Sequence, residues 1–202
     1  MKKIYLPLFI FTATLVYAQT GNNALKKIQN KFNSLSDFSA AFNQVVMDEN
    51  GKTTVKLNGS FFYKRKNKFV VELKNQLIVS NADLIWNYDK RQKRVVISYF
   101  EDDPTSFSLE KYIFDYPKLC RIKIIKNGNE EIINLIPKDD NLEFTDIKIW
   151  ADNDNMVRRL ELTDIGGVMY QIEFNDIKIN QQIEDSKFNF NPPKGTRIID
   201  LR

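Results

Sequence analysis

The chain lacks histidine entirely and has a single cysteine, Cys120, among its 202 residues. Without histidine, Ser-His and Cys-His nucleophilic pairs are excluded, and so is every zinc site that uses imidazole. One cysteine cannot form a disulfide within the chain. The fold must therefore be stabilised by its core.

Carboxylate acid/base chemistry stays formally open, because acidic residues cluster at positions 101–103, 139–140 and 152–154. Each cluster lies in a polar, turn-like stretch, which favours a solvated loop over a catalytic pair. Residues 152–155 begin like a calcium loop but lack its central glycine and distal glutamate. We expect no catalytic residue, no metal, no cofactor and no enzymatic activity.

Long apolar runs are absent after the N-terminus. The N-terminus is basic, then apolar as far as Val16, and it ends in the small residue Ala18. This order is typical of a secretory signal peptide, and the run is too short for a comfortable membrane span. We expect a signal peptide over residues 1–18 and one exported, soluble domain over residues 19–202.

Neither sign of charge is in large excess, with 30 basic and 26 acidic residues. Removal of Lys2 and Lys3 with the signal peptide leaves 28 basic residues, so the net charge is 28 − 26, or +2. The charges alternate along predicted strands and form no basic block. This pattern does not support nucleic-acid binding.

One amphipathic helix is predicted over residues 22–36, where apolar residues recur every three or four positions. The rest alternates with the two-residue period of strands, and Asn50-Gly51 and Asn127-Gly128 are hairpin turn signals. Residues 101–117 break the alternation and predict one or two helical turns. We expect about eleven short antiparallel strands, and we expect Pro192-Pro193 to stop any further strand.

The stretch 55–69 is the one around which the other strands are organised. Val55, Phe61 and Tyr63 share its apolar face, and the same parity carries Arg65 to the end of that face. A guanidinium aimed at an apolar interior needs fixed hydrogen-bond acceptors. Either Arg65 finds such acceptors, or the strand ends at Lys64 and Arg65 lies in a solvated turn.

A long sheet with one apolar face must curl onto itself or pack against another layer. Only one helix and one short insert are available to form that layer. A curled sheet of about eleven strands encloses more space than side chains readily fill. The pattern therefore leaves open two alternatives, an open barrel with a helical lid over an apolar hollow and a fully packed β-core without a ligand.

Four segments resemble the family of periplasmic outer-membrane lipoprotein carriers, LolA, over essentially the whole mature length. In chain order they read LSDFSAAFNQ at 35–44, GSFFYKRKNKF at 59–69, VSNADLIWNY at 79–88 and KFNFNPPKG at 187–195. Each segment alone is a weak signal. Their order and spacing behind a signal peptide make the resemblance specific.

The resemblance implies an incomplete, half-open antiparallel β-barrel covered by a helical lid, in agreement with the pattern of strands. It implies a periplasmic carrier that shields the acyl chains of triacylated lipoproteins and moves them from the inner to the outer membrane. The partners implied are an inner-membrane lipoprotein-releasing ABC transporter and an outer-membrane acceptor, either a receptor or the membrane itself. We expect a monomer.

The resemblance also assigns residues. The lid-locking arginine of the family falls on Arg65. Two positions depart from the family pattern, since Lys66 replaces a proline and Asn81-Ala82 replaces an Asp-Gly turn. Strand parity and the resemblance together predict that the acyl-chain cavity is lined by Phe38, Phe42, Phe61, Tyr63, Phe69, Val71, Leu73, Trp86 and Tyr88.

Two other functions are compatible with the same pattern. The cargo could be a different lipid, such as a glycolipid or a lipid-linked pigment, bound by a carrier or sensor on the same scaffold. The chain could also be an exported interaction module whose core is filled and which transports nothing.

Overall fold

The computed structural model describes residues 15–101, 108–128 and 130–202. Its first element is helix α1 (Leu15–Ser34). Two short helical segments, η1 (Lys111–Asp115) and α2 (Tyr116–Leu119), interrupt the strands, and a third, η2 (Asp185–Phe188), lies near the C-terminus. The strands are β1 (Asp37–Met47), β2 (Thr53–Lys64), β3 (Lys68–Leu73), β4 (Gln76–Asn81), β5 (Leu84–Asp89), β6 (Arg94–Tyr99), β7 (Cys120–Asn127), β8 (Glu130–Pro137), β9 (Phe144–Ala151), β10 (Val157–Asp164), β11 (Met169–Ile179) and β12 (Arg197–Asp200).

The twelve strands form one sheet in the order β12-β6-β5-β4-β3-β2-β1-β11-β10-β9-β8-β7. Neighbours are antiparallel except β12, which pairs in parallel with β6. Among the described residues, β12 and β7 stand at opposite ends of this order and do not pair with each other, so the sheet is open. This confirms the predicted fold of mainly antiparallel strands in an unclosed barrel with few helices.

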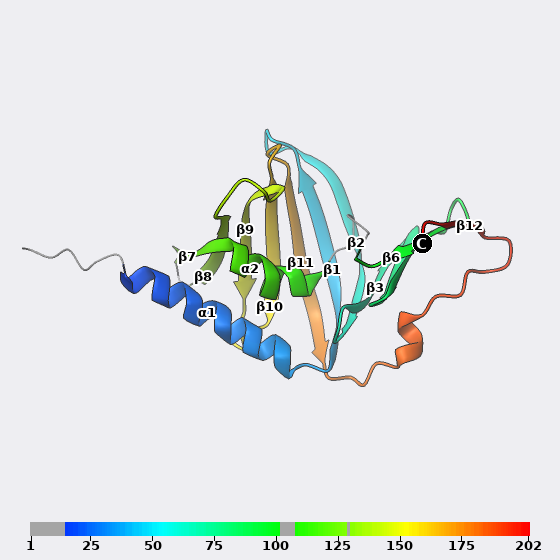
Figure 1. Ribbon diagram of the computed structural model, residues 1–202, viewed down its shortest axis with the longest axis horizontal. Helices are drawn as coiled ribbons and strands as arrows, with labels where there is room; N and C mark the ends of the chain where they lie inside the picture. Colours follow the sequence, from blue (N-terminus) through cyan, green and yellow to red (C-terminus); the bar gives the residue numbers. More distant parts are fainter. Residues whose placement is uncertain (1–14, 102–107, 129) are drawn as a thin grey trace, which may run out of the picture.

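The two faces of the sheet have different coverings (Figure 1). The inner face lies behind α1 and the insert, which comprises η1, α2 and the preceding residues from Ser108. Its apolar core includes Leu25, Ile28 and Phe32 from α1 and Ile113 from the insert. The outer face carries a smaller cluster around Val70, Val79 and Phe188.

Helix α1 contains the predicted apolar stripe, but it spans Leu15–Ser34 where the sequence predicted residues 22–36. Leu25, Ile28, Phe32 and Leu35 are each at most 5% exposed. The helix ends at Ser34, and Asp37 then opens β1. Because α1 has one apolar stripe and lysines beside it, it covers the inner face with that stripe and leaves Lys26 and Lys27 in solvent, with Lys31 half-buried.

The C-terminal tail, residues 180–202, crosses the outer face and returns to the far edge of the sheet (Figure 1). The expectation that Pro192-Pro193 stops any further strand is wrong, because β12 forms after the two prolines and pairs with β6. The prolines lie in the connection, where neither has to donate a hydrogen bond to a strand. The tail therefore adds one strand to the eleven expected.

Several other expectations concern residues that the structure does not describe. The signal-peptide prediction falls largely on residues 1–14, and part of the predicted insert falls on residues 102–107; both stretches lie outside the described residues. So does most of the acidic cluster at 101–103. The helical turns predicted for the insert are found in its described part, as η1 and α2.

Candidate functional site

The inner face presents a continuous layer of aromatic rings beneath α1. Phe32 of α1 packs on the Tyr63 ring with centroids 4.9 Å apart, and Tyr63 packs on Phe38 at 5.2 Å. The layer continues through Phe61 to Phe174, whose centroids are 5.7 Å apart. Phe174 comes from β11, which the register places beside β1 with Phe174 opposite Phe42.

Seven of the nine predicted lining residues lie on this inner face. Phe38, Phe42, Phe61, Tyr63 and Phe69 are each at most 6% exposed, and Val71 and Leu73 pack against them as partly buried side chains. The pairs Phe61–Val71 and Tyr63–Phe69 in the β2–β3 register bring these residues together.

The prediction is wrong for Trp86 and Tyr88, because both lie on the outer face. Trp86 packs in the cluster of Val70, Val79 and Phe188, and the Tyr88 ring lies 5.2 Å from that of Phe190 in the tail. The β4–β5 register pairs Trp86 with Val79 and Tyr88 with Leu77, which fixes their face. Alternation places Trp86 and Tyr88 on the same side of β5, but it does not say which layer covers that side.

Arg65 lies in the turn between β2 and β3 and contacts the C-terminal end of α1. Its Nε donates to the Leu35 carbonyl oxygen at 2.5 Å, and its second guanidinium nitrogen donates to the Asn33 carbonyl oxygen. The last carbonyls of a helix have no partner within the helix and carry its negative dipole end. Of the two alternatives left open by the sequence, the structure combines parts of both, since Arg65 is an exposed turn residue that nonetheless has fixed acceptors.

Glu110, just before η1, is a residue of this site that sequence reasoning missed. Its Oε1 accepts a hydrogen bond from Tyr63 Oη at 2.5 Å. Burial, followed by this hydrogen bond, raises the pKa of Tyr63 well above the usual range of a phenol, so Tyr63 remains a donor at neutral pH. The partners are 47 residues apart, and no local pattern signals such a pair.

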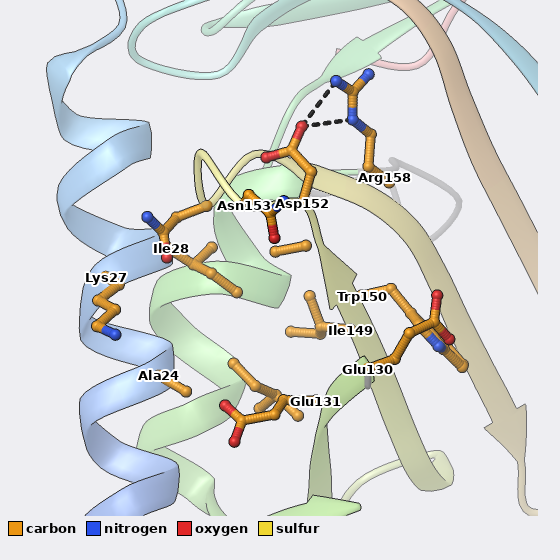
Figure 2. A pocket seen from close by; sticks show the side chains of 13 residues that line it. Ala24, Lys27, Ile28, Glu130, Glu131, Ile149, Trp150, Asp152, Asn153 and Arg158 are labelled. Atoms are coloured by element: carbon orange, nitrogen blue, oxygen red, sulfur yellow. Dashed lines mark hydrogen bonds and ion pairs between the residues drawn. The ribbon is translucent and has the colours of Figure 1, made fainter. Parts of the chain in front are cut away.

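A pocket of about 550 Å³ opens between α1 and strands β8 and β9 (Figure 2). Ile28 from α1 and Ile149 from β9 project into it, and both belong to the inner-face core. Its rim is polar. The full lining is Ala24, Lys27, Ile28, Glu130, Glu131, Ile133, Ile149, Trp150, Ala151, Asp152, Asn153, Asn155 and Arg158.

The carboxylate of Asp152, at the rim of the pocket, accepts hydrogen bonds from within its own turn and from Arg158. Although partial burial opposes it, hydrogen bonds from the Met156 backbone N–H and from Arg158 lower the pKa of Asp152. Arg158 Nε donates to Asp152 Oδ2 at 2.7 Å (Figure 2). These bonds fix the β9–β10 turn and keep Asp152 anionic, as expected of a structural turn residue.

Among the described helices, none has the length and apolar character needed to cross a bilayer. Within the same residues, no three side chains of the metal-binding kinds gather closely enough to hold an ion. The site is thus an apolar sheet face covered by helices, with hydrogen-bonded ends and a polar-rimmed opening.

Comparison with known proteins agrees with this class of fold. The model of the family described as outer membrane lipoprotein carrier protein LolA matches residues 33–191. The chain therefore belongs to the LolA family, a family of lipoprotein carriers.

Curated relatives share this description over almost their whole length. A protein of Francisella tularensis subsp. novicida named outer-membrane lipoprotein carrier protein is 28% identical over 208 residues, covering 99% of this chain and 98% of the relative. A protein of the same name from Chromohalobacter salexigens is 26% identical over 192 residues, covering 90% of this chain and 88% of the relative.

Solved structures share the fold at low sequence identity. An uncharacterized conserved protein from Thermus thermophilus superposes with a TM-score of 0.58 at 12% identity, covering 90% of this chain and 99% of that one. A putative outer membrane lipoprotein-sorting protein domain from Vibrio parahaemolyticus has a TM-score of 0.50 at 14% identity, covering 85% and 97%. These likenesses concern the fold alone.

Proposed function

We propose that this protein is a periplasmic carrier that shields lipoprotein acyl chains against its inner face and moves them from the inner to the outer membrane. It would take triacylated lipoproteins from an inner-membrane ABC transporter and give them to an outer-membrane acceptor. Family membership and the relatives' names support this role, and the carrier would act as a monomer without a cofactor.

The observation that carries the proposal is the hydrogen bonding of Arg65 to the end of α1. Arg65 pairs the last carbonyls of the helix with a side chain from a different element, the β2–β3 turn. Here the cover of an aromatic face is held at one end by a single side chain from a turn. Such a cover can be released and closed again without unfolding the sheet.

The magnitudes favour this arrangement. Burying one acyl chain of about 15 carbons gains on the order of 12 kcal/mol. Two hydrogen bonds to a charged group contribute at most about 3–6 kcal/mol, and less at an exposed side chain such as Arg65. Opening also uncovers the apolar stripe of α1, which costs about 1.5–3 kcal/mol for each buried side chain. These costs offset much of the gain from loading, which permits release.

The space for the chains would come from moving α1 off the rings that it now contacts. The proposed lining consists of the seven inner-face residues Phe38, Phe42, Phe61, Tyr63, Phe69, Val71 and Leu73. The pocket beside Ile28 and Ile149 is already open to solvent at its polar rim. A chain could enter there and keep its head group at the rim.

The carrier role is tested by mixing the purified protein with a detergent-solubilised triacylated lipoprotein and removing the detergent. We expect a soluble one-to-one complex on gel filtration, and no complex with the same lipoprotein lacking its acyl chains. Equal binding of the unacylated form, or no binding of either form, would reject the proposal.

Arg65→Leu tests the role of the hydrogen bonds from Arg65 to the end of α1. Without its two hydrogen bonds the cover recloses poorly, so we expect normal acceptance of cargo but transfer to acceptor vesicles reduced by about tenfold, equivalent to roughly 1.4 kcal/mol. Arg91→Leu, the same change at an exposed arginine in another turn, is the control. Normal transfer by Arg65→Leu would remove Arg65 from the mechanism.

A different lipid cargo is the second candidate. The inner-face layer is apolar and carries no feature that selects one acyl-bearing molecule over another. Lipid analysis of the protein purified from its own periplasm distinguishes the two. Triacylated lipoproteins support the carrier, whereas a glycolipid or lipid-linked pigment keeps the fold and reassigns its cargo.

A further inference from the structure

The turn between β2 and β3 contacts both covers of the inner face. Arg65, at its start, donates to the end of α1. Asn67, at its end, donates its backbone N–H to Glu110 Oε1 at 3.0 Å. The same carboxylate oxygen accepts from Tyr63 Oη at 2.5 Å. One turn therefore holds α1 on one side and the insert on the other.

Asn67 is itself fixed by two buried serines. Ser108 Oγ, in the insert, donates to Asn67 Oδ1 at 2.7 Å, and Ser80 Oγ, in β4, donates to the Asn67 carbonyl oxygen at 3.1 Å. Ser108 is 2% exposed and Ser80 is fully buried. Asn67 has a φ of +56°, a left-handed conformation that asparagine tolerates better than most residues. The turn thus presents fixed partners to the insert.

The two covers also contact each other. Gln29 Nε2 of α1 donates to the Ile113 carbonyl oxygen of η1 at 2.9 Å. The rings of Phe32 and Phe114 meet edge to face at 5.9 Å. Neither cover can move far without disturbing the other or the turn.

Tyr63 belongs both to the apolar layer and to the hydrogen-bonded contact with the insert through Glu110. Its ring packs against Phe32 and Phe38, at 4.9 and 5.2 Å, while its hydroxyl reaches Glu110. A side chain has one set of torsion angles, so a guest that displaces the ring also withdraws the hydroxyl. Tyr63 can therefore transmit the presence of a guest to the insert.

We propose that Glu110 is a positioning residue that holds the insert closed through Tyr63 and Asn67, and that α1 and the insert open as one unit when an acyl chain displaces the Tyr63 ring. The part of this proposal that concerns acyl-chain binding rests on the proposed function. The coupling between α1 and the insert in the empty protein is independent of the proposed function.

Hydrogen exchange on the empty protein tests the coupling. Tyr63→Phe removes the hydroxyl and keeps the ring, and Glu110→Ala removes the acceptor. For each we expect amides of both η1 and α1 to exchange about tenfold faster, the factor for loss of one ordinary hydrogen bond, with β9 and β10 unchanged. Glu110→Gln retains an acceptor oxygen and should restore most of the protection.

Asp115→Asn is the matched control, because this carboxylate lies in the same insert but is exposed and pairs with Lys118. It should leave the exchange of α1 unchanged. Faster exchange confined to the insert, or unchanged exchange in Tyr63→Phe, would overturn the proposal. Circular dichroism and urea unfolding of each variant establish that the sheet is intact.

Cargo experiments separate this proposal from the carrier role. With a triacylated lipoprotein, Tyr63→Phe should load at least as well as wild type and release about tenfold more slowly, because the closed state competes less well. Unchanged release would overturn the role of Tyr63 in loading. Failure of the wild type to bind cargo, with α1 and the insert still coupled in exchange, would reject the carrier role and leave the coupling standing.

Discussion

At the scale of single residues, side chains of very different chemistry meet where β2 ends and the turn after it begins. Arg65 contributes a charge to the end of a helix, and Tyr63 contributes a ring to the core and a hydroxyl to Glu110. The family pattern has proline where Lys66 stands. Lys66 has a φ of +66°, which proline cannot adopt, so this turn has its own conformation.

Gly59 gives a test of packing at one residue. It lies on the inner face between Phe42 of β1 and Leu73 of β3. A Cβ there would lie 2.2 Å from the Glu72 carbonyl oxygen, which is backbone and cannot turn aside. We expect Gly59→Ala to lower the free energy of unfolding by about 1–3 kcal/mol in urea denaturation.

Ser60→Ala, at the next position and on the outer face, is the control for Gly59→Ala. It should lower the free energy of unfolding by less than Gly59→Ala does. Equal midpoints for Gly59→Ala and wild type would show that the β2–β3 pair relaxes around the added methyl group.

At the scale of elements, α1 and the C-terminal tail cover opposite faces by different means. α1 is held by an apolar stripe and by hydrogen bonds at its end. The tail is held by Phe188, which is fully buried, and by ion pairs of Asp185 with Lys64 and Lys68 at 3.0 and 3.3 Å. Exposed ion pairs contribute little to stability. Phe188 is therefore the main anchor of the η2 part of the tail, while β12 is held by its pairing with β6.

Phe188→Ala tests this attribution. Loss of a buried phenylalanine costs about 3–5 kcal/mol, enough to loosen the η2 part of the tail from the outer face. We expect trypsin to cleave the tail, for example after Lys194, much faster than in wild type, while the secondary structure of the sheet persists. Asn189→Ala, an exposed neighbour, should leave the cleavage rate unchanged. Equal rates for Phe188→Ala and wild type would assign the docking of the tail to its other contacts.

At the scale of the whole molecule, an unclosed sheet is completed by covers that come from distant parts of the chain. The order of strands places the two chain halves on either side of β1. α1 and the insert lie in front of the half that runs from β1 to β7, and the turn after β2 connects them to the other half (Figure 1). Whether the inner face is covered therefore depends on contacts between distant parts of the chain. Cys120, which is buried in the inner-face core, can be used to measure how often the covers open.

Cys120 is 3% exposed in the inner-face core, at the junction of α2 and β7. Burial raises the pKa of its thiol, with Lys138 opposing the effect, so the reactive thiolate is scarce. We expect slow labelling by a disulfide reagent in the closed protein and about tenfold faster labelling in Arg65→Leu, where the covers open more often. An identical rate in both proteins would show that Arg65 does not control access to the inner face.

The sequence by itself determined the features that depend on local period. Alternation identified β2 and β3 and placed Phe61, Tyr63 and Phe69 on one face, and three- and four-residue spacing identified α1. The N-terminus and the segments resembling the family pointed to an exported lipoprotein carrier, and they singled out Arg65. Each of these follows from residues close together in the chain.

Only the tertiary structure decided the features that depend on register and on distant partners. The β4–β5 register placed Trp86 and Tyr88 on the outer face, because alternation groups the two residues on one side of β5 but does not say which layer covers that side. Pairing with β6 created β12 after two prolines. The bond between Tyr63 and Glu110 joins residues 47 positions apart. Local patterns fix which way a side chain points, but long-range packing alone fixes what it meets.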